Sequence, residues 1–343
     1  MQTSQRKSNI ELLRIICMIM ILAIHVNYFS TGALTTLEAE AFPIQSILRS
    51  FAHAVCACAV NTFVMISGYF GIKFKTKSIG SLIFQCLFFC IGIYIVMISL
   101  DLVEVSRLNL ASTLLLFKQA DCYWFIWSYI ILYILSPVLN SFSETCQRHE
   151  FKRTLILFFI LQFIIDSTPS NNYFLLGYSP LSFIGLYLLI RYIKRFGIAL
   201  TKIASLSIFI ICVILNTGIE YSVKLFNVNS DIISSVSMGN TNPITIIQSF
   251  ALLMYFTKLD ITNRFINWLA SSCLAVYLFH MHFCIVDYYR NFASDIYMRY
   301  NGFYYLAVIS LMIFVFFILP IGIDKIRIIC FNRLWRIIES NTK

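Results

Sequence analysis

The 343-residue sequence contains little charge. Asp, Glu, Lys and Arg make up 12% of it, which is about half of their share in a soluble domain, whereas hydrophobic residues make up 59%. This composition excludes an ordinary soluble enzyme and a disordered chain. The net charge of +10 comes from sparse residues between apolar runs, so a nucleic-acid-binding module is excluded as well. A lipid bilayer is the solvent that suits such a chain, and membrane lipid is its expected surrounding.

Paired cysteines are also lacking. The 11 cysteines include no C-x-x-C pair, which is the spacing typical of zinc sites and redox dithiols, and their number is odd. Most of them lie inside apolar runs, so we interpret them as small apolar packing residues. We expect neither a metal site nor a permanently bound cofactor.

Polar segments long enough for a soluble domain are missing too. We expect one membrane-embedded domain over residues 1–343, without an appended soluble domain, folded as an all-α polytopic bundle of about ten transmembrane helices. Pro137 and Pro180 fall inside the fourth and sixth apolar runs and are expected to kink them. The expected spans are 10–29, 48–71, 79–100, 123–140, 153–166, 174–192, 198–217, 243–257, 264–287 and 303–323.

The basic residues indicate the orientation of these spans. Ten spans place 19 of the 26 lysines and arginines on the side of the two termini and six on the other side, with Arg14 inside the first span. Because cytoplasmic loops carry an excess of Lys and Arg, both termini are predicted to be cytoplasmic. The sequence is therefore that of a multi-pass protein of the cell membrane (inner or plasma membrane).

Ionisable residues at membrane depth are costly and mark candidate functional sites. Four of the five histidines, His25, His53, His280 and His282, map to the outer half or outer end of a span, which suggests a common site. The alternative is that each histidine only forms a hydrogen bond with a neighbouring helix.

Arg14 and His25 are eleven residues apart in the first span. Eleven steps of 100° end ~20° past three full turns, so both side chains project from one helix face, ~16 Å apart along the axis. This stripe suits a ligand with an anionic head and a long thin arm, such as coenzyme A, with its phosphates at Arg14. Alternatively, Arg14 is an interface anchor paired with Glu11.

Two further groups allow two interpretations each. Lys73, Lys75 and Lys77 follow the second span and either extend a phosphate-binding rim or only satisfy the topology rule. Trp124 lies with other aromatic residues at the outer start of the fourth span. It is either an interfacial anchor or part of a platform on which a sugar stacks.

At these residues the chain resembles the acyltransferase-3 family of bacterial membrane O-acyltransferases, which modify cell-surface glycans. The family's first-helix pattern, a basic residue followed after ten residues by histidine, is matched by Arg14 through His25 in NIELLRIICMIMILAIHVNYF. Three further segments are similar to the family, namely VNTFVMISGYF (residues 60–70), CYWFIWSYIILYILSPVLN (residues 122–140) and SSCLAVYLFHMHF (residues 271–283).

The resemblance implies transfer of an acyl group, commonly acetyl, from cytoplasmic acyl-CoA to a hydroxyl of an extracytoplasmic, usually lipid-linked, sugar. Arg14 and His25 would be the essential pair. The family's paired-arginine motif is absent, and only Lys73, Lys75 and Lys77 stand near its place, as candidate donor-binding residues. On the acceptor side the candidates are His53, Trp124, His280 and His282.

We expect His25 to act as the general base toward the acceptor hydroxyl, with a transient acyl-histidine as the variant mechanism. Two other classes of function stay open from the residues alone. One is a glycan-lipid flippase or other transporter, and the other is a glycan polymerase that uses no acyl-CoA.

Overall fold

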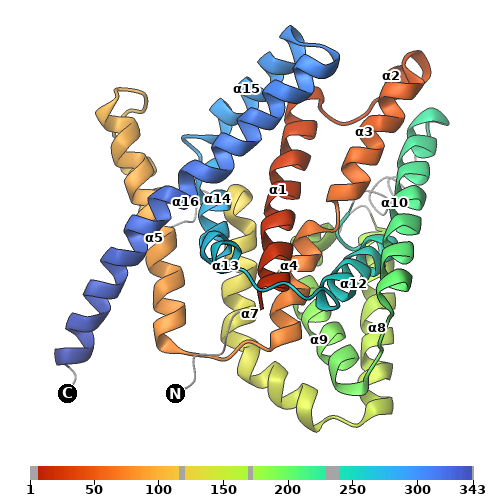
Figure 1. Cartoon of the computed structure of the whole chain (residues 1–343), viewed down its shortest axis with the longest axis horizontal. Coiled ribbons are helices and arrows are strands. Elements are labelled where there is room, and N and C mark those ends of the chain that lie inside the picture. Colours follow the sequence, from red (N-terminus) through yellow and green to blue (C-terminus); the bar gives the residue numbers. More distant parts are fainter. Residues whose placement is uncertain (1–6, 116–119, 169–172, 229–238, 342–343) are drawn as a thin grey trace. The chain divides into compact units, whose positions relative to one another are not determined.

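The computed structural model describes residues 7–115, 120–168, 173–228 and 239–341, and within them it is helical, with no β-strand (Figure 1). This confirms the all-α fold. The helices used below are α1 (Ser8–Thr31), α2 (Thr36–Ala41), α3 (Pro43–Cys56), α4 (Ala59–Phe70), α5 (Thr76–Ser99), α6 (Arg107–Leu115), α7 (Ala120–Thr145), α8 (Arg148–Asp166), α9 (Pro180–Phe196), α10 (Lys202–Leu225), α12 (Pro243–Thr257), α13 (Arg264–Ala270), α14 (Cys273–His280), α15 (Val286–Arg299) and α16 (Gly302–Asn341).

Six helical segments of the described chain are long and apolar enough to cross a membrane, which confirms a polytopic membrane protein. The count of ten spans and the cytoplasmic position of the termini stay predictions. The short helix α12 is apolar as well. The six segments are Ser8–Thr31, Pro43–Phe70, Thr76–Ser99, Tyr123–Thr145, Lys202–Leu225 and Gly302–Ile337.

Two details of the expected spans are wrong. Pro180 does not kink a helix, because it is the first residue of α9, where its missing N–H has no helical partner to lose. The Ser179 side chain caps this end by accepting a hydrogen bond from the Ser182 backbone N–H. The expected continuous segment 264–287 is instead divided into α13, α14 and a turn that leads into α15.

The chain divides into two compact units, each of which is described by itself. The first unit comprises Met1–Lys73 and Phe125–Arg264. In it α12 packs against α10, α4 and α1, while α1 also packs against α3 and α4 (Figure 1). Gly68 lets α4 approach α9 closely, since a Cβ at this position would lie 2.1 Å from Ile190 Cγ2 and 2.9 Å from the Tyr187 carbonyl oxygen.

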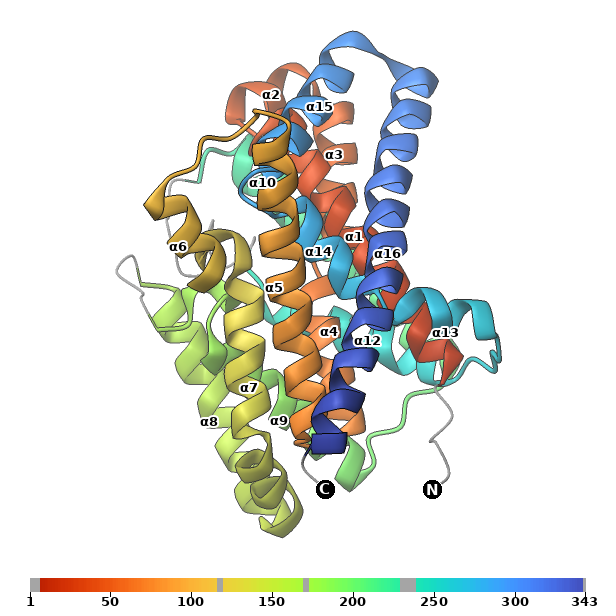
Figure 2. The same ribbon diagram turned by 90° about the vertical axis from the view of Figure 1, so that its left-hand side faces the viewer.

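The second unit comprises Phe74–Trp124 and Phe265–Lys343. Within it α14 packs against α5 and α16, and α5 and α16 also contact each other (Figure 2). A buried polar cluster joins these two long helices. Gln85 donates a hydrogen bond of 2.9 Å to the Asp324 carboxylate, which also pairs with the Arg327 guanidinium at 2.8 Å.

A buried network of amide side chains joins three segments of the first unit. The Asn216 amide of α10 donates to Gln248 Oε1 at 3.1 Å, and Gln248 Nε2 donates to the Ala54 carbonyl oxygen at 2.9 Å. One residue further along α12, the Ser249 hydroxyl donates to the Cys58 carbonyl oxygen at 3.1 Å. The side chains of α12 therefore bond the backbone where α3 passes into α4, at a depth where lipid offers no hydrogen bonds.

Replacing Gln248 with Leu should destabilise the first unit by about 2 kcal/mol, because the Ala54 carbonyl and the Asn216 amide lose a partner in a buried site. Thermal unfolding of detergent-solubilised protein, followed with a thiol-reactive dye that labels the buried free cysteines as they become exposed, measures this change. Ile247→Leu is the control, since Ile247 is exposed on the same helix. Equal unfolding temperatures for the two variants would contradict the role given to the network.

Candidate functional site

Helix α1 carries both Arg14 and His25. The helix is continuous from Ser8 to Thr31, so the predicted geometry applies, with both side chains ~20° apart around the axis and ~16 Å apart along it. Met18 and Leu22, which lie between them on the same stripe, are buried. The middle of the stripe is therefore covered by other parts of the protein.

The Arg14 guanidinium forms an ion pair with the carboxylate of Glu11, three residues earlier on α1. Arg14 Nη1 lies 2.6 Å from Glu11 Oε1, and the Arg14 side chain is 30% exposed whereas that of Glu11 is 7% exposed. The pairing expected for an interface anchor is thus present. Within the described residues, however, Glu11 is the one side chain bonded to this guanidinium, so further N–H groups are available for a ligand.

The His25 imidazole is half-buried further along the stripe. It stacks on Phe29, one turn later, with the ring centroids 5.6 Å apart and the planes inclined by 25°. The stacking contact limits the orientations that the ring can take. An imidazole is a side chain that can exchange protons with a bound group near neutral pH.

Basic side chains that sequence reasoning had assigned only to topology gather at the end of α4. Arg191 lies against the Gly71 turn, where it pairs with Glu144 at 3.1 Å, and Lys194 donates to the Tyr69 carbonyl oxygen. Partial desolvation of the Lys194 ammonium, together with the positive charges of Arg191 and Lys7, lowers its pKa. These residues form a local excess of positive charge that an anion would relieve.

The three predicted donor-side lysines are divided between the two units. Lys73 is an exposed residue of the first unit, in the loop after α4, and its carbonyl oxygen accepts a hydrogen bond from Tyr133 at 3.2 Å. Lys75 and Lys77 belong to the second unit, where the Lys77 ammonium lies 5.6 Å from the centre of the Trp335 ring. Trp124 is half-buried in α7 and also belongs to the second unit. Their roles stay predictions.

His280 and His282 are fully buried in the second unit. His280 Nδ1 lies 2.6 Å from the Val276 carbonyl oxygen one turn earlier, so this nitrogen donates to its own helix. His282 Nδ1 accepts from the Cys284 backbone N–H at 3.1 Å, which leaves Nε2 to donate to the Cys90 carbonyl oxygen at 3.3 Å. These bonds favour the alternative in which both histidines only satisfy backbone groups.

His53 has a different surrounding. Its Nδ1 lies 2.8 Å from Glu220 Oε2, which joins α3 to α10 across 167 residues of sequence. The His53 side chain is 21% exposed and that of Glu220 is 8% exposed. The structure therefore pairs one predicted acceptor-side histidine with a carboxylate from a helix distant in the sequence.

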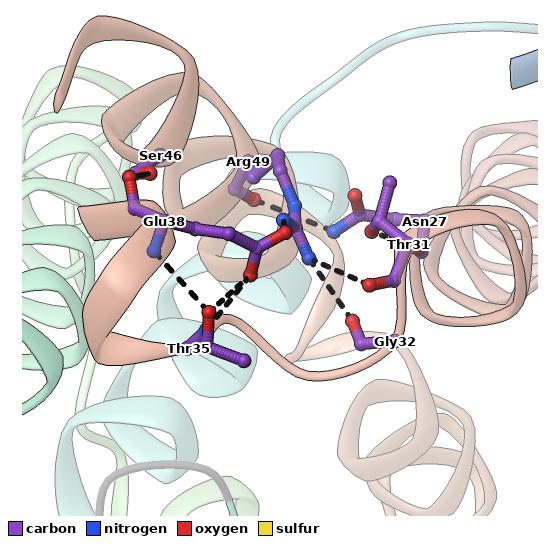
Figure 3. A network of polar contacts seen from close by, with 7 residues as sticks. All are labelled: Asn27, Thr31, Gly32, Thr35, Glu38, Ser46 and Arg49. Atoms are coloured by element: carbon purple, nitrogen blue, oxygen red, sulfur yellow. Dashed lines mark hydrogen bonds and ion pairs between the residues drawn. The ribbon is translucent and has the colours of Figure 1, made fainter. Parts of the chain in front are cut away.

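A polar network at the end of α1 fixes the position of α3 (Figure 3). The Arg49 guanidinium pairs with Glu38 at 3.0 Å and donates to the Gly32 carbonyl oxygen at 3.1 Å, while the Asn27 amide donates to the Arg49 carbonyl oxygen at 3.4 Å. Glu38 and Thr35 also form a capping box at the start of α2. The network thus joins α1 to α3. The contact is made by Asn27, two residues after His25, and by Arg49, four residues before His53.

The sequence profile of the acyltransferase domain family matches residues 7–323, which is nearly the whole chain. The chain belongs to the acyltransferase-3 family. It is therefore a membrane acyltransferase, as the first-helix pattern and its three companion segments predicted. Neither the curated proteins nor the solved structures that were compared with the chain include a match.

The Glu38 network predicts a pH-dependent stability for this acyltransferase. Partial burial acts to raise the pKa of Glu38, but the hydrogen bonds with Thr35 and the charge of Arg49 outweigh it and hold the pKa below its ordinary value. A lowered native pKa means that the carboxylate stabilises the fold at pH values above the ordinary pKa. This contribution is lost as the pH falls through the native pKa.

Glu38→Gln should therefore unfold at a lower temperature than the unmodified protein at about pH 7, and the two should converge at about pH 3. Thermal unfolding in detergent at both pH values tests this expectation. Glu40→Gln is the matched control, because Glu40 is an exposed residue of the same short helix. A difference that is the same at both pH values would exclude the proposed linkage.

Proposed function

We propose that this chain is an O-acyltransferase of the cell membrane that moves an acyl group, most simply acetyl, from cytoplasmic acyl-CoA to a hydroxyl of an extracytoplasmic cell-surface glycan or glycolipid. One observation carries the proposal. Within the acyltransferase domain, a guanidinium and an imidazole lie on a single stripe of an unbroken apolar helix, and the residues between them on this stripe are buried.

The donor site is assigned to the end of the first unit that carries Arg14. Coenzyme A is anionic at its nucleotide end, and guanidinium groups bind phosphates in a bidentate manner. Arg14 supplies one such group, and Lys7, Lys73, Arg191 and Lys194 add positive charge in the same unit. The uncharged pantetheine arm then extends along the stripe for ~16 Å toward His25.

The chemistry is assigned to His25. In the proposed step the acceptor hydroxyl gives its proton to a ring nitrogen of His25 while the oxygen attacks the carbonyl carbon of the thioester. The carbon–sulfur bond then breaks, and the departing sulfur takes the proton from the imidazolium. The products are the O-acyl ester and free coenzyme A, and the imidazole returns to its starting state.

Removal of the imidazole should slow this reaction strongly. His25→Ala is expected to lower the turnover number by about 10²-fold to 10⁴-fold, which is the usual contribution of a general base. The measurement is transfer of label from radiolabelled acetyl-CoA to a cell-envelope glycolipid extract by purified, correctly inserted protein. His149→Ala is the control, since His149 is exposed at the start of α8.

Native activity of His25→Ala would remove His25 from the mechanism. Incubation with labelled acetyl-CoA in the absence of the extract distinguishes the variant mechanism, because an acyl-histidine would leave label on the protein that His25→Ala does not carry.

Loss of the guanidinium should weaken donor binding. Arg14→Ala is expected to raise the KM for acetyl-CoA at least tenfold, because a charge-assisted hydrogen bond to phosphate is lost, with little change in the acceptor KM. Arg14→Lys keeps the charge beside the buried Glu11 carboxylate and should lie in between. Arg290→Ala, which breaks a similarly spaced but exposed pair with Asp287, is the control. An unchanged KM in Arg14→Ala would exclude it from the donor site.

A further inference from the structure

The His53–Glu220 pair leaves one edge of the imidazole available. When Glu220 is ionised its carboxylate only accepts hydrogen bonds, and the 2.8 Å contact then places a proton on His53 Nδ1 and leaves the Nε2 lone pair of the neutral ring available. No residue of the described chain is hydrogen-bonded to Nε2, and the side chain keeps 21% of its surface exposed. A carboxylate that orients a histidine in this way prepares Nε2 to accept a proton or a hydrogen bond.

The pair is not needed to hold α3 and α10 in the same bundle. One turn before Glu220, the Asn216 amide already connects α10 through Gln248 to the carbonyl of Ala54, the residue after His53. This connection uses neutral groups that are fully buried. A second tie made of two ionisable groups at membrane depth has a higher desolvation cost, which is characteristic of functional rather than structural residues.

The turn of α3 before His53 carries further polar atoms that lack partners. Ser50 Oγ and Arg49 Nε are buried, and no atom of the described chain forms a hydrogen bond with either of them. Ser50 precedes His53 by three residues and Arg49 by four, so all three side chains lie on neighbouring positions of one helix face. A ligand with several hydroxyls, each of which can donate and accept, matches this set of groups.

The register of α1 and α3 gives His53 and His25 a similar depth in the first unit. Asn27 and Arg49 are in contact through a hydrogen bond, and the two helices run antiparallel from there (Figure 1). His25 lies two residues from Asn27 and His53 lies four residues from Arg49. At 1.5 Å per residue, the two imidazoles are within about one helical turn of each other in depth.

From these observations we infer that His53, oriented by Glu220 and followed outward by Ser50 and Arg49, is the subsite that binds the hydroxyl groups of a carbohydrate acceptor. His53 Nε2 accepts a hydrogen bond from an acceptor hydroxyl and holds the sugar at the depth of His25, while Glu220 is a positioning residue. The inference rests on the proposed function, since it assigns the acceptor side of the same site.

The experiment separates acceptor binding from donor binding. His53→Ala and Glu220→Ala are expected to raise the half-saturating amount of cell-envelope glycolipid extract about tenfold, the equivalent of one hydrogen bond, with an unchanged KM for acetyl-CoA. Glu220→Gln keeps an acceptor oxygen for Nδ1–H and should restore most of the affinity. Tyr221→Phe is the control, because it removes a different hydrogen bond of α10, to the Ala39 carbonyl oxygen, and should change neither value.

A readout without turnover uses the thermal shift that the extract produces in the unmodified protein, which should be lost in His53→Ala and retained in Glu220→Gln. Equal changes in the KM for acetyl-CoA and in the half-saturating amount of extract would reduce the pair to a structural role and overturn the inference. A loss of stability with an unchanged half-saturating amount of extract would do the same. If His53→Ala does not fold, His53→Gln and Glu220→Gln give the same comparison. Failure of the unmodified protein to transfer acetyl to the extract would instead refute the proposed function.

Discussion

The absence of water from the bilayer core is the constraint on which this structure depends. Every backbone carbonyl that leaves a regular helix there needs a partner from the protein. The passage from α3 to α4 meets this need through Gln248 of α12, which bonds the Ala54 carbonyl oxygen, and Ser249 adds a bond to the Cys58 carbonyl oxygen, which also accepts from the Thr62 backbone N–H. The interruption is thereby kept in a fixed place, so His53 above it and the Gly71 turn below it also have fixed positions in the first unit.

The same constraint distinguishes the histidines from one another. His280 and His282 are enclosed by aromatic and backbone groups of the second unit, and both ring nitrogens of His282 are bonded to the backbone. A ring whose two nitrogen atoms both bond the backbone has no free donor or acceptor for a substrate. His53 has one nitrogen on a carboxylate and an exposed edge, and His25 is half-buried beside Phe29. Position at the outer half of a span, which sequence reasoning used to group these residues, is therefore a weaker criterion than the state of each ring nitrogen.

Local features of the molecule were predictable from the sequence, and long-range ones were not. Apolar runs give the helices, and the spacing of Arg14 and His25 gives a shared face, because both follow from the periodicity of one helix. The contact between His53 and Glu220 joins residues 167 positions apart, and no periodicity reports it. The gathering of Arg191 and Lys194 at the Gly71 turn depends on how closely α4 and α9 approach at Gly68, which is a property of packing.

Pro180 and the segment 264–287 show a second reason for missed features. Hydropathy measures how well a segment tolerates lipid, but it does not indicate where the backbone changes direction. A proline at the first position of a helix and a proline within one have the same effect on a window average, yet the first starts α9 and the second would bend it. Ser271 and Ser272, between α13 and α14, likewise lie in an apolar run, and the hydropathy of this run does not indicate that the helix is interrupted there.

In the proposed reaction the placement of charge on α1 explains how donor and acceptor meet without either crossing the membrane. The phosphates of acyl-CoA are too costly to bring into an apolar core, so they stay with Arg14 and the basic residues of the same unit, and only the uncharged arm extends inward. A sugar is uncharged but rich in hydroxyls, and it needs hydrogen-bonding side chains at the depth it reaches. The polar face of α3 supplies them, and the Arg49–Glu38 network sets the depth of this face against α1. The depth at which each substrate is held in the proposed reaction thus depends on one continuous helix and one ion-paired turn.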